Sequence, residues 1–114
     1  MELFERNACD LSEMIKNKEI SSAELTKSVF DRIKAVEGKV DAYLTLDEEN
    51  AMKKAAEIDE RLAKGEELSP LAGIPVGIKD NISTKGLRTT CASKMLENYV
   101  PPFNAVSYTH LRAH

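Results

Sequence analysis

The segment Leu71–Asn81 has the sequence LAGIPVGIKDN, a run of small and aliphatic residues that ends in a lysine, an aspartate and an asparagine. Its aliphatic content and its length predict a short strand that enters the protein core. Pro75 is compatible with the start or the edge of such a strand, and Gly77 allows another part of the chain to pack closely against the backbone. The functional question is why this strand should end on the ammonium group of Lys79.

Several interpretations of Lys79 compete on pattern alone. A lysine at a strand end usually reaches solvent or pairs with a neighbouring acid, and Asp80 is adjacent. A phosphate-binding P-loop is excluded, because its glycines need four residues between them and Gly73 and Gly77 are closer in sequence. The segment Val76–Lys79 is similar to the lysine-bearing strand of protein kinases, but no glycine-rich loop precedes it. A kinase lobe is therefore excluded as well.

A catalytic role is the third interpretation of Lys79. Burial at the end of a strand removes water from an ammonium group and disfavours its charged form. A lysine that becomes neutral in this way can form a Schiff base, or it can act as the base that activates a serine hydroxyl. The surrounding fold must then offset the cost of the buried amine.

The composition is typical of a globular protein. Of the 114 residues, 42% are hydrophobic and 31% are charged, with a formal net charge of -3. This length fits one domain or part of a larger one, and no apolar run approaches the roughly 20 residues that cross a bilayer. The N-terminus lacks the pattern of a secretory signal, so we expect a cytoplasmic protein without a membrane partner. The interspersed charges give no indication of direct nucleic-acid binding by this segment.

Hydrophobic periodicity predicts three helices and a second strand. The clearest boundary is Ser21, an N-cap that opens a capping box, and Gly38 is well placed to end the same helix. Residues 40–46, VDAYLTL, alternate in polarity and predict a half-buried strand. The third helix is expected to begin after Asp47, to end near Gly65 and to carry a solvated charged face. The inward positions are expected to be Phe4, Ala8, Leu11 and Ile15, then Leu25, Val29, Ile33 and Val36, then Ala51, Ala55, Ile58 and Leu62.

Residues that could bind a metal or serve as a histidine base are few. Cys9 and Cys91 are isolated in the sequence, so neither a zinc site nor a disulfide framework is indicated, and we expect buried or idle thiols. Both histidines, His110 and His114, lie in the terminal segment VSYTHLRAH, which lacks helical periodicity. A nucleophile paired with histidine would therefore have to rely on that segment.

Residues 71–105, LAGIPVGIKDNISTKGLRTTCASKMLENYVPPFNA, resemble the first signature region of the amidase signature family. The most specific part is GIPVGIKDN, and the resemblance extends over residues 1–105. It implies an α/β fold with a mixed sheet flanked by helices, of which this portion is mostly helical. Residues 1–105 are then expected to be the truncated N-terminal part of an amidase domain. The departure begins at Val106, so residues 106–114 are expected to be a foreign or read-through tail.

The resemblance also implies a mechanism. Members of the family hydrolyse amides with a Ser-cisSer-Lys triad, in which the lysine takes a proton through the bridging serine. Lys79 matches the catalytic lysine. Asp80 and Asn81 match the motif, and we expect them either to support the lysine or to serve the turn that follows it. Both triad serines lie further along the family's sequence than this chain reaches. The hydroxyl groups of Ser83, Thr89, Thr90 and Ser93 do not occupy the nucleophile position and are expected to serve turns and helix caps.

Within the family, the chain is most similar to the glutaminase subunits of tRNA-dependent amidotransferases. This similarity implies that the parent protein releases ammonia from glutamine to convert Glu-tRNA(Gln) to Gln-tRNA(Gln). The implied partners are the B and C subunits of the amidotransferase and, through the complex, the charged tRNA. No cofactor is implied for the glutaminase itself, whereas its partner is expected to use ATP and Mg2+. Two alternatives remain open: another amidase-signature hydrolase of small amides, or a non-catalytic docking fragment.

Overall fold

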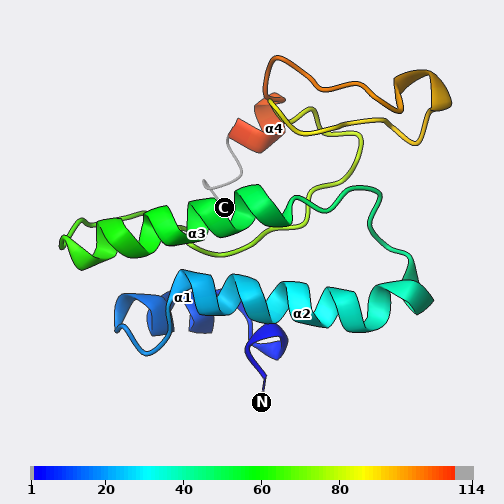
Figure 1. Cartoon of the computed structure of the whole chain (residues 1–114). Helices are drawn as coiled ribbons and strands as arrows, with labels where there is room; N and C mark the ends of the chain where they lie inside the picture. Colours follow the sequence, from blue (N-terminus) through cyan, green and yellow to red (C-terminus); the bar gives the residue numbers. More distant parts are fainter. Residues whose placement is uncertain (1, 110–114) are drawn as a thin grey trace. The chain divides into compact units, whose positions relative to one another are not determined.

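The computed structural model describes residues 2–109, and its regular elements are helical (Figure 1). They are, in chain order, η1 (Leu3–Glu5), α1 (Ala8–Lys16), α2 (Ser22–Val40), α3 (Glu48–Ala63), η2 (Lys94–Leu96) and α4 (Val106–Thr109). The chain divides into two compact units, Met1–Pro75 and Val76–His114. We call them the helical unit and the signature unit and describe each by itself. His110 and His114, and with them most of the predicted foreign tail, lie outside the described residues.

The first helix of the helical unit begins later than its periodicity predicts. The side chain of Asn7 accepts a hydrogen bond from the backbone N–H of Asp10 at 2.9 Å, so Asn7 is the N-cap and α1 starts at Ala8. Phe4 lies before this cap, in the short helix η1. The predicted inward positions Leu11 and Ile15 are buried, whereas Ala8, at the first position of α1, is exposed.

The start of α2 is predicted correctly, but its end is not. The hydroxyl of Ser21 accepts a hydrogen bond from the N–H of Glu24 at 3.0 Å, as expected of the N-cap. The helix then continues past Gly38 to Val40 and ends at Asp41, which adopts the left-handed conformation (φ 51°). Aspartate tolerates this conformation better than most residues, so a glycine is not needed there.

Neither predicted strand forms among residues 2–109. Val40 belongs to α2, and the segment that follows is irregular, with Leu44 61% and Leu46 46% exposed. A strand must share its backbone hydrogen bonds with a neighbouring strand, and the only pairing in the described region is an isolated bridge between Thr84 and Leu87. Instead, the backbone N–H groups after α2 bond to the carboxylate of Glu37. The mixed sheet that the family resemblance implies is therefore not observed among the described residues.

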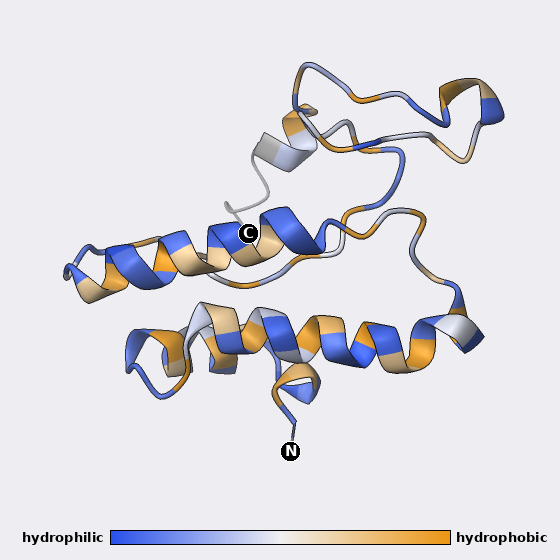
Figure 2. Ribbon diagram, viewed as in Figure 1, coloured by the Kyte–Doolittle hydropathy of each residue, from blue (hydrophilic) through white to orange (hydrophobic). Residues whose placement is uncertain are grey.

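The core of the helical unit is formed where the apolar faces of its helices meet. Helix α2 packs against α3 and η1, and Figure 2 shows hydrophobic positions recurring along each helix between hydrophilic ones. Leu25 is fully buried and forms a cluster with Leu11 and Ile15. Further buried apolar side chains are Phe30, Ile33 and Ala55, and the partly buried side chains that pack on the cluster are Leu3, Met14, Ile20, Val29, Leu62 and Ile74.

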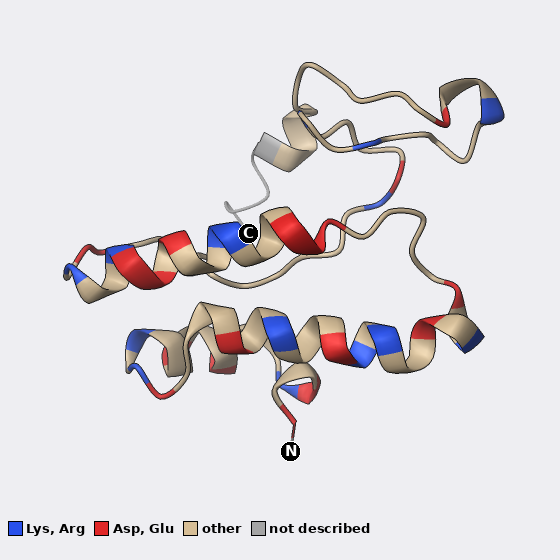
Figure 3. Ribbon diagram, viewed as in Figure 1, with Lys and Arg blue, Asp and Glu red and all other residues tan. Residues whose placement is uncertain are grey.

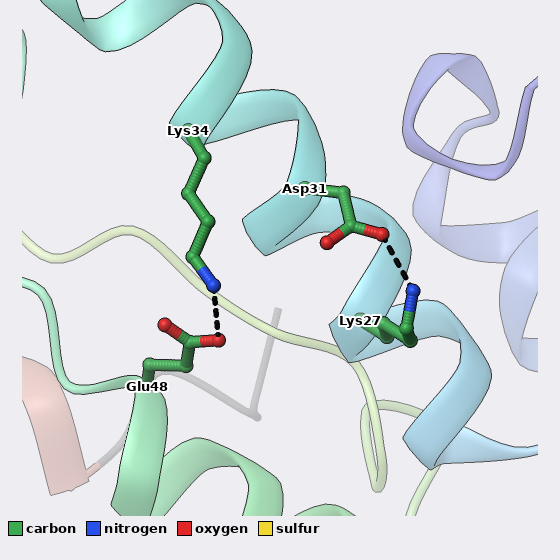
Figure 4. Close-up of polar contacts among 4 residues, drawn as sticks. All are labelled: Lys27, Asp31, Lys34 and Glu48. Carbon is green, nitrogen blue, oxygen red and sulfur yellow. Dashed lines mark hydrogen bonds and ion pairs between the residues drawn. The ribbon is translucent and has the colours of Figure 1, made fainter.

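Charged residues are distributed along the helices rather than gathered on one of them (Figure 3). On α3, Glu49 pairs with Lys53 at 3.6 Å and Glu60 pairs with Lys64 at 3.4 Å. Figure 4 shows two closer pairs: Lys27 with Asp31 within α2, at 2.8 Å, and Lys34 of α2 with Glu48 of α3, at 2.9 Å. All of these side chains are exposed to solvent, which screens and weakens each pair.

The signature unit is organised by backbone hydrogen bonds rather than by regular elements. Residues 83–89 run antiparallel to residues 99–105, with bonds from Gly86 N–H to Pro101 C=O at 3.1 Å and from Thr89 N–H to Tyr99 C=O at 3.0 Å. Among residues 76–108, the buried ones are Thr84, Thr89, Thr90 and Pro101. Within the described part of the chain, no helix is both long and apolar enough to cross a bilayer.

Candidate functional site

Lys79 lies in the signature unit, at the end of an irregular extended segment. Its carbonyl accepts a hydrogen bond from the N–H of Ile82 at 3.0 Å, so the chain turns immediately after the lysine. The side chain of Lys79 is exposed. The burial on which the hypothesis of a neutral amine depends is thus not provided by residues 2–109, and the catalytic role of Lys79 stays a prediction.

Asp80 is the most connected side chain of the site. Its carboxylate accepts hydrogen bonds from the backbone N–H of Thr90 at 2.8 Å, from the N–H of Ala92 at 3.2 Å and from the hydroxyl of Thr90. Its carbonyl accepts a further bond from the N–H of Cys91 at 2.9 Å. Asp80 therefore attaches the loop of residues 90–92 to the turn that carries Lys79.

These contacts favour the ionised form of Asp80. The hydroxyl of Thr90 has the largest effect in lowering the pKa of the Asp80 carboxyl, followed by the backbone N–H of Thr90; the N–H of Ala92 and the charge of Arg88 add to the shift. Partial burial opposes the shift without reversing it. Each donor stabilises the carboxylate but not the neutral acid, so the network requires an ionised Asp80.

The loop that Asp80 holds contains two left-handed residues in succession. Cys91 has φ 51° and Ala92 has φ 57°, although neither is a glycine. For such residues this conformation costs on the order of 1 kcal/mol each. The hydrogen bonds from Cys91 and Ala92 to Asp80 offset this cost, as does the bond of 2.8 Å from the N–H of Ser93 to the carbonyl of Thr90.

The other residues predicted near the site lie in turns and loops. Asn81 is exposed in the turn after Asp80. The prediction that nearby hydroxyl groups serve turns and caps is confirmed for two of them: Thr89 donates to the carbonyl of Leu87 at 3.0 Å, and Ser93 accepts from the N–H of Met95 at 3.2 Å. The direct contact between Thr90 and Asp80 was not predicted, because nothing in the sequence fixes how the loop returns to the turn.

Thiol groups and possible metal ligands were also considered as functional groups. Cys9 and Cys91 are both free thiols, and both are exposed, so the expectation of buried thiols is wrong and they remain candidates only for idle ones. No group of three or more His, Cys, Asp or Glu side chains that could hold a metal ion is found between residues 2 and 109. The polar network around Asp80 is the best-defined cluster of functional groups near the lysine.

Comparison with known proteins decides the family. A family model described as Amidase matches residues 24–114, a range that contains the lysine, the Asp80 network and most of the helical unit. The chain belongs to the amidase family. The match also runs through residues 106–114, the segment that the sequence resemblance left out.

Two relatives of this amidase-family chain have the same name. It is 54% identical over 112 residues to the A subunit of glutamyl-tRNA(Gln) amidotransferase from Carboxydothermus hydrogenoformans, covering 98% of this chain and 23% of that protein. It is 52% identical over 113 residues to the protein of the same name from Geobacillus kaustophilus, covering 99% of this chain and 23% of that protein. The chain thus spans about a quarter of the length of the curated relatives it matches.

A solved structure provides a fold neighbour for the amidase-family chain. It is described as a vestigial protein complex that reveals the evolutionary origins of an s-triazine catabolic enzyme. The match has a TM-score of 0.85 at 28% identity and covers 95% of this chain and 24% of that one. The amidase fold is therefore supported for this chain, although the sheet of the predicted α/β architecture is not among the described elements.

Proposed function

We propose that these residues form the N-terminal portion of the glutaminase subunit of a tRNA-dependent amidotransferase. The observation that carries this proposal is the identity of about one half, over nearly the whole chain, to proteins named as the A subunit of glutamyl-tRNA(Gln) amidotransferase. The parent protein, meaning the longer polypeptide of which these residues are a part, releases ammonia from glutamine. The shared name favours this function over a hydrolase of unrelated small amides.

The proposed chemistry assigns different tasks to Lys79 and Asp80. In the family mechanism, a neutral lysine takes a proton from a bridging serine, which takes the proton of the nucleophilic serine as that serine attacks the amide carbon. The lysine returns this proton through the bridging serine to the amide nitrogen, which leaves as ammonia while the nucleophilic serine becomes acylated. Water then attacks the acyl-enzyme, returns a proton to the serine oxygen and releases glutamate. Lys79 is the proton acceptor, and the parent's remaining residues supply both serines and the burial that Lys79 needs. Asp80 holds the loop of residues 90–92, and Asn81 supports the turn beside it.

The proposal includes partners and a compartment. The B subunit of the amidotransferase receives the ammonia and uses ATP and Mg2+ to activate Glu-tRNA(Gln), and the C subunit completes the complex. The glutaminase itself uses no cofactor, and the assembly is cytoplasmic. The mixed sheet is completed by the rest of the parent. We also propose that residues 106–114 are a foreign tail, because their sequence departs at Val106 from the pattern of the resemblance, although the Amidase model matches through residue 114.

The proposal is tested by measuring ammonia release from glutamine. The parent protein in complex with the B and C subunits is expected to release ammonia and to transfer it to Glu-tRNA(Gln). The chain of 114 residues alone is expected to release no more than a buffer blank, because two of the three triad members lie outside it. Glutamine hydrolysis by the short chain alone, or a parent complex without glutaminase activity, would contradict the assignment.

A further inference from the structure

The first turn of α2 has an unusual set of hydrogen-bond acceptors. A helix begins with backbone N–H groups that have no partner within the helix. Here the N–H of Glu24 is satisfied locally by Ser21, but those of Ser22 and Ala23 donate to the carboxylate of Asp59, at 2.7 and 3.0 Å. Asp59 lies on α3. One carboxylate thus binds two N–H groups at the positive end of another helix, an arrangement that the helix dipole also favours.

Ser22 extends this contact to the signature motif. Its hydroxyl donates to the carbonyl of Gly73 at 2.8 Å, and its side chain is almost completely buried, with 1% of its surface exposed. Gly73 is the first residue of the Gly-Ile-Pro-Val sequence that leads to Lys79. The clamp, as we call Asp59, Ser22 and Gly73 together, therefore links two helices to the start of that segment.

A side chain at position 73 would be strained by the backbone conformation and would press on its neighbours. The φ of Gly73, +84°, lies in the region that favours glycine. A Cβ added there would lie 3.0 Å from the hydroxyl oxygen of Ser22 and 3.2 Å from the Cγ2 of Ile58. The backbone of Gly73 is thus held by a hydrogen bond and by its own close packing, while the residues that follow up to Lys79 belong to no regular element.

We propose that Asp59 and Ser22 are positioning residues for the amidase reaction, which hold the backbone of Gly73 so that the segment ending at Lys79 starts from a fixed point. The inference rests on the proposed function, because it concerns the lysine of that triad. Neither residue is assigned contact with the substrate. Their effect on the reaction is through the geometry of Lys79, and misplacement of a catalytic group by about 1 Å can lower a rate by about 100-fold.

The test uses the parent protein in its complex and compares Ser22→Ala and Asp59→Ala with the wild type. Each variant is expected to lower kcat for glutamine hydrolysis by about tenfold or more, with KM changed less than about twofold, because the substrate contacts are untouched. Asp59→Asn keeps one acceptor oxygen and is expected to recover part of the loss. The double variant is expected to lose little more than either single variant, because both residues act through one connection.

Ser12→Ala is the matched control. The hydroxyl of Ser12, on α1, also donates to a loop carbonyl, that of Pro70 at 2.6 Å. This bond is outside the clamp, since Pro70 precedes Gly73 in the chain. The kcat of the Ser12→Ala variant is expected to equal that of the wild type. The rates are compared at a temperature where circular dichroism shows each variant to be folded, so that a loss of stability does not pass for a loss of rate.

Hydrogen exchange of the N–H groups of Ala72 and Ile74 provides a readout that does not depend on activity. These groups flank Gly73 and donate to the carbonyls of Ser69 and Leu71, at 3.0 and 3.1 Å. Exchange there is expected to be faster in Ser22→Ala and Asp59→Ala than in Ser12→Ala and the wild type. Folded clamp variants with wild-type kcat and unchanged exchange would overturn the inference while leaving the glutaminase function intact. If the wild-type parent shows no glutaminase activity, the proposed function fails, and unchanged exchange in the variants would then refute the clamp as well.

Discussion

The two units of this chain are stabilised in different ways. The helical unit buries large aliphatic and aromatic side chains, among them Leu25 and Phe30, between its helices. The signature unit buries threonines and a proline, whereas Met95 and Phe103 are 96% and 54% exposed. Hydrophobic burial therefore dominates in the first unit, and hydrogen bonds to backbone and carboxylate groups dominate in the second.

This difference shows where the chain can tolerate substitution. A hydrophobic core responds to the volume of its side chains, because a cavity costs free energy in proportion to its size. A network of hydrogen bonds responds to the loss of a single donor, because the buried acceptor then remains without a partner. The residues next to Lys79 belong to the second kind, so polar substitutions of similar size are the informative ones there.

The largest effect on stability is expected for Leu25→Ala, since Leu25 is fully buried in the cluster with Leu11 and Ile15. The free energy of unfolding of the helical unit should fall by about 2–5 kcal/mol. Urea titration followed by the circular dichroism of the helices measures it. Val100→Ala is the control in the signature unit, where Val100 is 51% exposed, and it should change stability by no more than about 0.5 kcal/mol. Equal effects of the two substitutions would contradict the distinction between the units.

A smaller effect is expected for Thr90→Val, which removes the hydroxyl donor to Asp80 while keeping the shape of the side chain. The loop of residues 90–92 should lose about 0.5–1.5 kcal/mol of local stability, measured by hydrogen exchange. The pKa of Asp80 should rise toward its ordinary value, because its main stabilising donor is gone. The control is Thr84→Val, since the buried hydroxyl of Thr84 donates to the carbonyl of Ile82 instead. A shift of the Asp80 pKa in the control but not in Thr90→Val would refute this network.

The pH dependence of the same loop follows from the direction of the shift. The folded structure lowers the pKa of Asp80, so the stabilisation is fully present above the pKa of the unfolded chain. It is lost as the pH falls through the lower pKa of the folded state. NMR titration of the Asp80 carboxyl should give a midpoint below that of an exposed aspartate, and the N–H signals of Thr90 and Ala92 should move with it. A midpoint at or above the ordinary value would show that the hydrogen bonds do not form.

Helices were predicted well from the sequence because their signals are local. Ser21 caps α2 with its own side chain, and the inward positions Leu25 and Ile33 follow the helical repeat. The end of α2 was predicted wrongly at Gly38, because the residue that adopts the left-handed conformation at the helix end is Asp41. The tertiary cap by Asp59 could not be foreseen, because it joins residues far apart in the sequence.

Strands and the loop around Lys79 were predicted poorly, because their structure depends on residues far apart in the sequence. The alternation in residues 40–46 describes a face that a strand could bury, but the described chain contains no neighbouring strand to pair with it. The motif points to Lys79 and Asp80, whose roles stay predictions, and the family model matches the range of residues that contains them. The contact between Thr90 and Asp80 depends on the left-handed conformations of Cys91 and Ala92, which their residue types do not predict.

The central claim is that Lys79 is the base of an amidase triad. The most direct measurement is the kcat for glutamine hydrolysis by the parent complex carrying Lys79→Ala, compared with Lys64→Ala, which alters an exposed lysine paired with Glu60. We predict that Lys79→Ala lowers kcat by about 1,000-fold or more with the complex still assembled and folded, and that Lys64→Ala has no effect. A folded Lys79→Ala complex with the kcat of the wild type would contradict the claim and leave Lys79 as an ordinary solvent-exposed lysine.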